Sequence, residues 1–140
     1  MYLSVIKDLY DGFIVAHATR SQNSVDLVTT TLQRALHHHP HLKGLALHSD
    51  QGAQYCSQAY FRMTHQAQIT PSMSRRGNCW DTASMENFFG HLKAEAIHPV
   101  KLETIQQAKE VIDDYIYFYN HERIQLKTKL TPFELRCQSV

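Results

Sequence analysis

An Asp-Gly pair between two strand-like runs is the feature that most constrains how this chain begins its fold. Residues 1–7 alternate loosely between apolar and polar side chains, and residues 13–19 form a second apolar, partly β-branched run. Asp11 and Gly12 lie between them, and glycine accepts the positive φ that tight hairpin turns require. The pattern therefore predicts an antiparallel β-hairpin at the start of the chain.

Helical and strand-like patterns alternate through the middle of the chain. A helical period over residues 24–39 ends before Pro40, because a residue that precedes proline disfavours the α conformation. An apolar run at 45–49 predicts a buried strand, and residues 57–67 predict a short helix. Residues 68–80 are polar and rich in turn formers, which predicts an irregular loop.

Two longer helices are predicted in the C-terminal half. The first begins at Asp81 or Thr82, and the second begins at Thr104 and ends near Asn120. Gln107, three residues after Thr104, completes a capping-box pattern. The apolar side chains on the buried face of the first helix are Met85, Phe88, Phe89, Leu92 and Ala96.

This order of elements predicts an α/β fold in which the hairpin joins a mixed sheet with flanking helices. We divide the 140 residues into a core over 1–121 and a basic, irregular C-terminal tail over 122–140. Lys and Arg number 14 against 13 Asp and Glu, and this net charge of +1 excludes a histone-like protein but not a local basic patch. The absence of a long apolar run or signal-like start predicts no membrane association and a cytoplasmic location.

Two carboxylates and a lysine are the candidate catalytic residues. Asp50 directly follows the predicted strand, at the end where ligand crevices form in open α/β sheets. Glu86 lies early in a predicted helix, and Lys93 follows seven residues later, about two turns on and on the same face. Carboxylates bind Mg²⁺, and two such ions can assist phosphoryl transfer. Spacing alone favours a plainer interpretation, in which Asp50 caps a turn and the other two belong to a solvated helix face.

Longer sequence words carry a family resemblance. Residues 48–55 (HSDQGAQY) resemble the second-aspartate motif of the DDE transposase and retroviral integrase superfamily. Residues 72–93 (SMSRRGNCWDTASMENFFGHLK) resemble the loop and glutamate segment of its insertion-sequence transposases. Residues 115–120 (YIYFYN) are similar to their C-terminal signature, and residues 2–15 to the second and third strands of their core.

The resemblance implies a fold, a reaction and site residues. The fold is RNase H-like, with a mixed five-stranded sheet and flanking helices. Asp50 would be the second acidic metal ligand, Glu86 the third, and Lys93 the basic residue that contacts DNA near the cleaved end. The implied reaction is Mg²⁺- or Mn²⁺-dependent 3′-end cleavage and strand transfer of transposon DNA. The implied partners are transposon ends, target DNA, and a second copy or a full-length transposase.

The loop before Glu86 is a candidate DNA contact. Arg75, Arg76 and Trp80 combine basic and aromatic side chains, which suit phosphate contact and stacking against a distorted DNA end. An exposed charged loop is the alternative. The tail is a weaker candidate for phosphate contact, and its basic side chains are Arg123, Lys127, Lys129 and Arg136.

The chain departs from the family pattern at its start. The family's first catalytic aspartate lies in a Trp-x-x-Asp-x-Thr-like word on a strand before Tyr2, and the sequence holds no such word. Asp8 matches a later aspartate of the family's hairpin, and Asp11 is a turn residue. We therefore expect two of three metal ligands, weak metal binding, no first (central) strand, and an N-terminally truncated core that is inactive alone. We expect residues 2–7 either to keep an unpaired edge or to pair with 45–49.

A second hypothesis is a remnant without catalysis that binds only DNA or a full-length transposase subunit. Two other patterns are weaker candidates. The histidines at 37–39 and 41 could bind a transition metal, but a position at a helix C-terminus explains them. His48, Ser49 and Asp50 are adjacent, so neighbouring side chains on a strand point to opposite faces and form no hydrolase triad.

Overall fold

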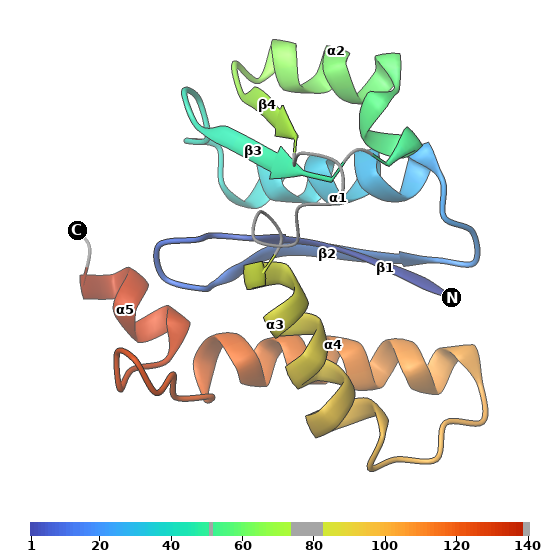
Figure 1. Ribbon diagram of the computed structural model, residues 1–140, viewed down its shortest axis with the longest axis vertical. Coiled ribbons are helices and arrows are strands. Elements are labelled where there is room, and N and C mark those ends of the chain that lie inside the picture. The colour runs from blue at the N-terminus through green and yellow to red at the C-terminus, as the bar shows by residue number, and fades with distance from the viewer. Residues whose placement is uncertain (51, 74–82, 139–140) are drawn as a thin grey trace. The chain divides into compact units, whose positions relative to one another are not determined.

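The computed structural model describes residues 1–50, 52–73 and 83–138, and these form two compact units (Figure 1). The first unit comprises Met1–Ile6 and Val15–Ala83, and the second comprises Lys7–Ile14 and Ser84–Val140. The strands of the opening hairpin contribute to both units. Across the described residues, every helix is too short or too polar to cross a membrane.

The predicted hairpin is present. Strands β1 (Tyr2–Lys7) and β2 (Ile14–Arg20) form a two-stranded sheet and run side by side (Figure 1). In the connection, the Asp8 N–H donates to Phe13 O at 2.9 Å, and the Gly12 N–H donates to Asp8 O at 2.9 Å. Gly12 has φ +81°, the left-handed conformation for which the sequence places glycine there.

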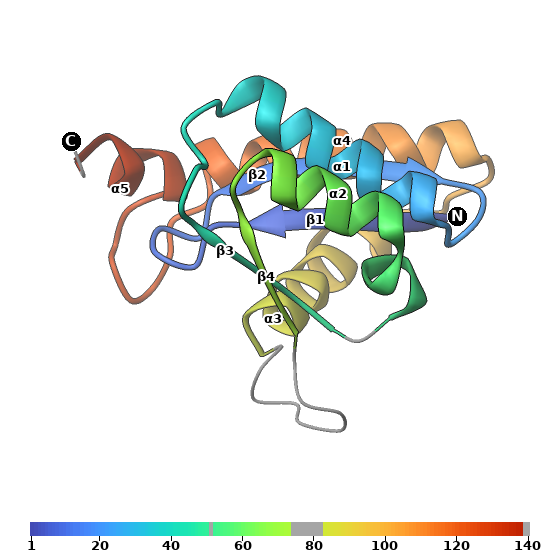
Figure 2. The ribbon, with the colours of Figure 1, turned by 90° about the horizontal axis from the view of Figure 1, so that it is seen from above.

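The first unit packs two helices against a short parallel pair of strands. Helix α1 (Val25–His38) begins after the N-cap Ser24 and ends before Pro40, and helix α2 (Gln58–Gln66) packs beside it (Figure 2). In the sequence, β3 (Ala46–Ser49) and the 3₁₀ turn η1 (Ala53–Cys56) come between these two helices. The buried centre consists of Leu32, Tyr60 and Ile69.

The predicted loop at 68–80 is wrong over its first part. Strand β4 (Thr70–Met73) pairs in parallel with β3, with Ala46 opposite Thr70 and Ser49 opposite Met73. The sequence did not predict this strand, because Thr-Pro-Ser-Met lacks β-branched apolar residues and contains a proline. Proline is confined to strand edges, which is consistent with a strand that pairs on one side.

The strand predicted at 45–49 is present as β3, but the prediction that it is buried is wrong. Leu45 is 53% exposed, and β3 alternates between exposed and half-buried residues. Among the described strands, β1 hydrogen-bonds only with β2 and β3 only with β4, so they form two ladders instead of one mixed sheet. Of the two expectations for 2–7, the unpaired edge is therefore the one observed.

The second unit is built on two helices that share an aromatic core. Helix α3 (Ala83–Leu92) continues into a π-helical turn, η3 (Lys93–Ile97), and α4 (Ile105–His121) follows. Phe88 is fully buried, and its ring packs edge-to-face against Tyr119 with the ring centroids 5.0 Å apart. The capping box of Thr104 and Gln107 is confirmed. The π turn was not predicted, because the apolar stripe of α3 passes through it unbroken.

The irregular tail predicted after residue 121 is wrong in part, because it contains helix α5 (Pro132–Gln138). Its start carries a second capping box: the Glu134 N–H donates to Thr131 Oγ1 at 3.1 Å, and the Thr131 N–H donates to Glu134 Oε1 at 3.3 Å. Pro132 occupies the first helical position, where its missing N–H is harmless. This start signal was present in the sequence.

Candidate functional site

Asp50 lies directly after β3, at the carboxyl end of the parallel β3–β4 pair. Its Oδ1 accepts a hydrogen bond of 2.7 Å from the Gly52 N–H, and its side chain is exposed. A Cβ at Gly52 would come within 2.9 Å of the same Oδ1. Glycine at 52 thus allows the backbone to hold one carboxylate oxygen, while Oδ2 has no hydrogen-bond partner among the described residues.

Tyr55 and His48 are the polar aromatic side chains near Asp50 in the sequence. Burial and the nearby Asp50 charge both raise the pKa of the Tyr55 phenol, which keeps it neutral. On the paired strands, His48 Nδ1 lies 2.9 Å from Ser72 Oγ. The His48 ring therefore contacts its register partner on the neighbouring strand.

Glu86 and Lys93 lie on one helix of the second unit. Glu86 is in the first turn of α3, where the positive end of the helix dipole favours a carboxylate, and it is exposed. Lys93 opens the π turn, is exposed, and has no ion-pair partner among the described residues. Seven residues along a helix return to the same face, about 10 Å further on. The predicted common face of Glu86 and Lys93 is therefore consistent with the helix.

Both ends of this helix are held by charged side chains. At its start, Lys7 Nζ donates to Ser84 O at 3.1 Å and lies 6.0 Å from the Tyr119 ring centroid. At its end, Glu95 accepts from Arg123 Nε at 2.9 and 3.0 Å and from the Tyr115 hydroxyl at 2.5 Å. Sequence reasoning missed these roles for Lys7 and Glu95, because their partners are 77 and up to 28 residues away.

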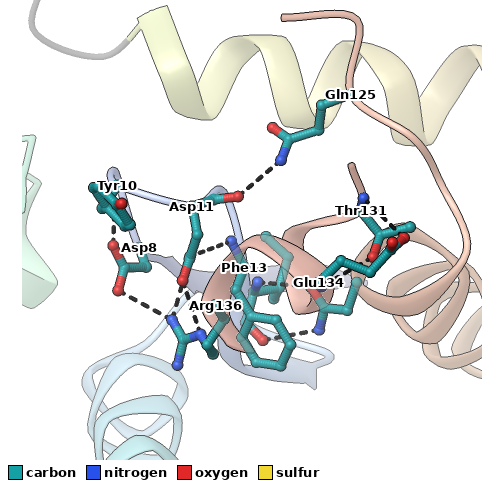
Figure 3. A network of polar contacts seen from close by, with 10 residues as sticks. Asp8, Tyr10, Asp11, Phe13, Gln125, Thr131, Glu134 and Arg136 are labelled. Atoms are coloured by element: carbon teal, nitrogen blue, oxygen red, sulfur yellow. Dashed lines mark hydrogen bonds and ion pairs between the residues drawn. The ribbon is translucent and has the colours of Figure 1, made fainter. Parts of the chain in front are cut away.

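The two aspartates of the hairpin connection have a structural partner (Figure 3). Arg136 Nε donates to Asp11 Oδ2 at 2.9 Å, and its Nη2 donates to Asp8 Oδ2 at 3.0 Å. The guanidinium also lies over the Phe13 ring, 4.3 Å from its centroid. Gln125 Nε2 completes the network by donating to Asp11 O at 2.8 Å. Asp8 and Asp11 thus hold α5 against the hairpin connection within the second unit.

The structure brings together only some of the predicted site residues. Glu86 and Lys93 share α3 and its π turn, and Asp50 belongs to the other unit. Arg75, Arg76 and Trp80 lie outside the described residues. Arg123 and Arg136, considered as phosphate contacts, are both in ion pairs. Over the described residues, no three His, Cys, Asp or Glu side chains gather closely enough to hold a metal ion.

Comparison with protein-family models decides the family. Two models, each described as integrase core domain, match residues 1–79 and residues 86–140. The chain belongs to the integrase core domain family. The first match contains Asp50, and the second begins at Glu86 and contains Lys93.

Two relatives named as transposase-like or as a putative transposase agree with this membership, and they confirm the resemblance that the sequence motifs carry. The chain is 40% identical to an uncharacterized transposase-like protein of Haemophilus influenzae, over all of this chain and 65% of that protein. It is 37% identical to a putative transposase of Escherichia coli, InsK for insertion sequence element IS150, over 99% of this chain and 50% of that protein. The chain thus spans about half to two thirds of the length of these two relatives.

Solved structures establish the fold. A chain of the simian T-cell lymphotropic virus intasome, solved in complex with a PP2A regulatory subunit, aligns over 95% of this chain and 47% of its own length, with TM-score 0.81 and 17% identity. The HTLV-2 integrase catalytic core domain, solved with magnesium, aligns over 94% of this chain and 82% of its own length, with TM-score 0.73 and 15% identity. The fold is therefore the RNase H-like fold of integrase catalytic cores.

Proposed function

We propose that this chain is the catalytic-core part of an insertion-sequence transposase, which cleaves and joins DNA by metal-dependent phosphoryl transfer. The observation that supports this most is the match of integrase core models to both segments that carry the candidate carboxylates. A transposase-like protein and a putative transposase also match it over nearly its full length.

Asp50 and Glu86 are the proposed metal ligands. Both are exposed carboxylates, and their hard oxygen donors suit Mg²⁺ or Mn²⁺. Asp50 Oδ1 accepts from the Gly52 N–H, which orients the carboxylate, and Oδ2 has no hydrogen-bond partner among the described residues. A bound divalent ion would supply activation of the attacking oxygen and stabilisation of the leaving oxygen.

Lys93 is the proposed contact to DNA on the same helix as Glu86. A lysine ammonium is a point charge suited to a phosphate, and Lys93 is exposed. Arg75, Arg76 and Trp80 stay proposals from their sequence alone. The DNA ligands we propose are transposon ends and target DNA, and a second copy or a longer transposase is the proposed protein partner.

The 140 residues hold two of the three acidic ligands that the mechanism requires, so we propose that the chain by itself binds metal weakly and does not cleave DNA. The ion pairs of Asp8 and Asp11 with Arg136 support this, because both carboxylates already serve the α5 contact. The second candidate function, a remnant that binds DNA or a transposase subunit without catalysis, makes the same prediction for the isolated chain.

A chimera distinguishes the two functions. The part of InsK that precedes its match to this chain is joined to Met1, and 3′-end cleavage of labelled IS150 end duplexes is measured with Mg²⁺. We expect cleavage that is lost in Asp50→Asn and in Glu86→Gln, and retained in the matched control Glu110→Gln on the exposed face of α4. DNA binding without cleavage would instead support the remnant.

The isolated chain supplies the second arm. Robust Mg²⁺-dependent cleavage by the 140 residues alone, abolished by Asp8→Ala with Asp50 and Glu86 intact, would overturn the claim that a ligand is missing.

A further inference from the structure

The helix that carries Glu86 ends in an unusual way. After Leu92 the chain passes into a π-helical turn, and the His98 N–H donates to Lys93 O, five residues back, at 2.8 Å. π turns are rare, because their wider ring loses backbone packing, and they occur often at functional sites. Lys93 is the first residue of this turn, so the turn determines where its backbone stands.

Glu95, in the middle of the π turn, ties it to the end of α4. Its two carboxylate oxygens lie 3.0 and 2.9 Å from Arg123 Nε, and Oε2 also accepts from the Tyr115 hydroxyl at 2.5 Å. Arg123 Nη2 lies 3.3 Å from Nδ1 of His91, which is two residues before the π turn. Glu95 and Arg123 together thus link the last turn of α3, the π turn and α4.

Burial and charge are consistent with a held carboxylate. The Glu95 side chain is 36% exposed and the Arg123 side chain 22%. Burial alone would raise the pKa of Glu95, but the hydrogen bonds from Tyr115 and Arg123 and the charges of Arg123 and His91 lower it below its ordinary value. The central guanidinium carbon of Arg123 lies 5.8 Å from the ring centroid of Tyr119. Tyr119 is a core residue and is 5% exposed.

We propose that Glu95 is a positioning residue for Lys93, acting through the π turn that it fastens to Arg123 and Tyr115. The exposed Lys93 ammonium is then presented from a fixed backbone instead of a fraying helix end. This inference rests on the proposed contact of Lys93 with DNA. It adds a role for Glu95, Arg123 and Tyr115, which act through the π turn and do not themselves contact DNA.

The sign of the effect separates positioning from simple electrostatics. Removal of a negative side chain near bound DNA strengthens binding by a purely electrostatic effect. Positioning predicts the opposite, because a loosened Lys93 makes a poorer phosphate contact. Glu103 is exposed, and its carboxylate forms a long ion pair of 4.0 Å with Lys101. It serves as the matched control for the loss of one negative charge.

The experiment measures binding of the 140-residue chain to a fluorescent duplex oligonucleotide over a range of salt concentrations. Lys93→Ala should reduce the slope of log K against log salt by about 1, the loss of one phosphate contact. Glu95→Ala should reduce this slope by nearly the same amount. The double variant Lys93→Ala/Glu95→Ala should bind the duplex as tightly as Lys93→Ala does. Glu103→Gln should bind as tightly as the unchanged chain, or more tightly.

Two further variants protect the test against misfolding. Arg123→Lys keeps the charge but loses the guanidinium contacts, and Glu95→Gln keeps an acceptor for Tyr115, so both should fall between the unchanged chain and Glu95→Ala. Faster hydrogen exchange of the His98 N–H in Glu95→Ala, with α4 amides unchanged, should accompany the loss.

Each other outcome has a definite meaning. If Lys93→Ala reduces the slope and Glu95→Ala does not, or if their effects add, the positioning role is wrong and the DNA contact stands. If Lys93→Ala leaves binding unchanged, the proposed DNA contact fails and the positioning role fails with it.

Discussion

Arg136 and Asp11 form an ion pair of 2.9 Å across 125 residues of sequence, and the Asp11 side chain is only 4% exposed. The same guanidinium reaches Asp8 at 3.0 Å (Figure 3). An aspartate buried to this degree is costly to leave without a cation. The contact therefore explains why the hairpin connection carries two acidic residues, without assigning either of them to a metal.

Loss of the Arg136 guanidinium should destabilise the second unit. In Arg136→Ala, the Asp11 carboxylate stays buried without its cation, so we expect a fall of about 1–3 kcal/mol in the free energy of unfolding. Urea unfolding followed by circular dichroism measures this. Lys101→Ala, which removes an exposed 4.0 Å pair, is the control and should change stability by less than about 0.5 kcal/mol. Equal effects of the two variants would contradict a structural role for the pair.

Gly52→Ala should displace the Asp50 carboxylate. The added Cβ would meet Asp50 Oδ1 and Gln54 Oε1, each at 2.9 Å. Because Gly52 has φ −60°, alanine fits the backbone itself, and we expect stability to change by less than about 1 kcal/mol. Binding of Mn²⁺ should weaken about tenfold, as is typical for loss of the groups that orient a metal ligand. Unchanged Mn²⁺ affinity would argue against Asp50 as a ligand held by this turn.

Gly90→Ala should stabilise α3. Nothing lies within 4 Å of a Cβ at Gly90, and alanine in a helix interior is favoured over glycine by about 0.5–1 kcal/mol. The midpoint of thermal unfolding should therefore rise. Gly90 stands four residues after Glu86 and three before Lys93, so a fall in stability would contradict the open helix face that we assign to them.

The Glu95 contacts should contribute stability that depends on pH. The folded-state pKa of Glu95 lies below its ordinary value of 4.5, so the folded chain binds fewer protons than the unfolded chain near that pH. The contribution is present above pH 4.5 and is lost as the pH falls through the lower folded-state value. The difference in stability between the unchanged chain and Glu95→Gln should therefore shrink as the pH is lowered from 6 to 3.

The groups facing Glu95 set the controls for that measurement. They are Tyr115, Arg123 and His91, so the comparison is repeated in a His91→Gln background to remove the imidazole. A difference that grows toward acid pH in both backgrounds would show that the carboxylate is not stabilised in its charged form.

Local signals made much of the fold predictable. The Asp11-Gly12 turn, the end of α1 before Pro40 and the Thr104 capping box depend on a few adjacent residues, and all three are present in the structure. Strand β4 and the exposure of β3 depend on which strands pair, and pairing is decided by distant parts of the chain. Helix α5 had a local start signal in Thr131, Pro132 and Glu134, so its omission was an error of interpretation.

The candidate site was predictable to a different degree. Asp50, Glu86 and Lys93 could be named because long sequence words resemble a family, whereas their spacing alone favoured a plainer interpretation. The roles of Lys7, Glu95 and Arg136 could not be derived, because each depends on a partner brought close by folding. Sequence reasoning therefore named residues through a family resemblance and missed those whose contacts depend on distant parts of the chain.

Paramagnetic broadening most directly tests the proposal that Asp50 and Glu86 are metal ligands. Mn²⁺ is added at low concentration to the ¹⁵N-labelled chain, and the amide signals of Gly52 and Asn87, next to the two carboxylates, are followed. We expect both signals to broaden, with Asp50→Asn weakening the effect at Gly52 and Glu86→Gln weakening it at Asn87, whereas Asp8→Asn changes neither. Broadening confined to the histidines at 37–41, with Gly52 and Asn87 unchanged, would contradict it.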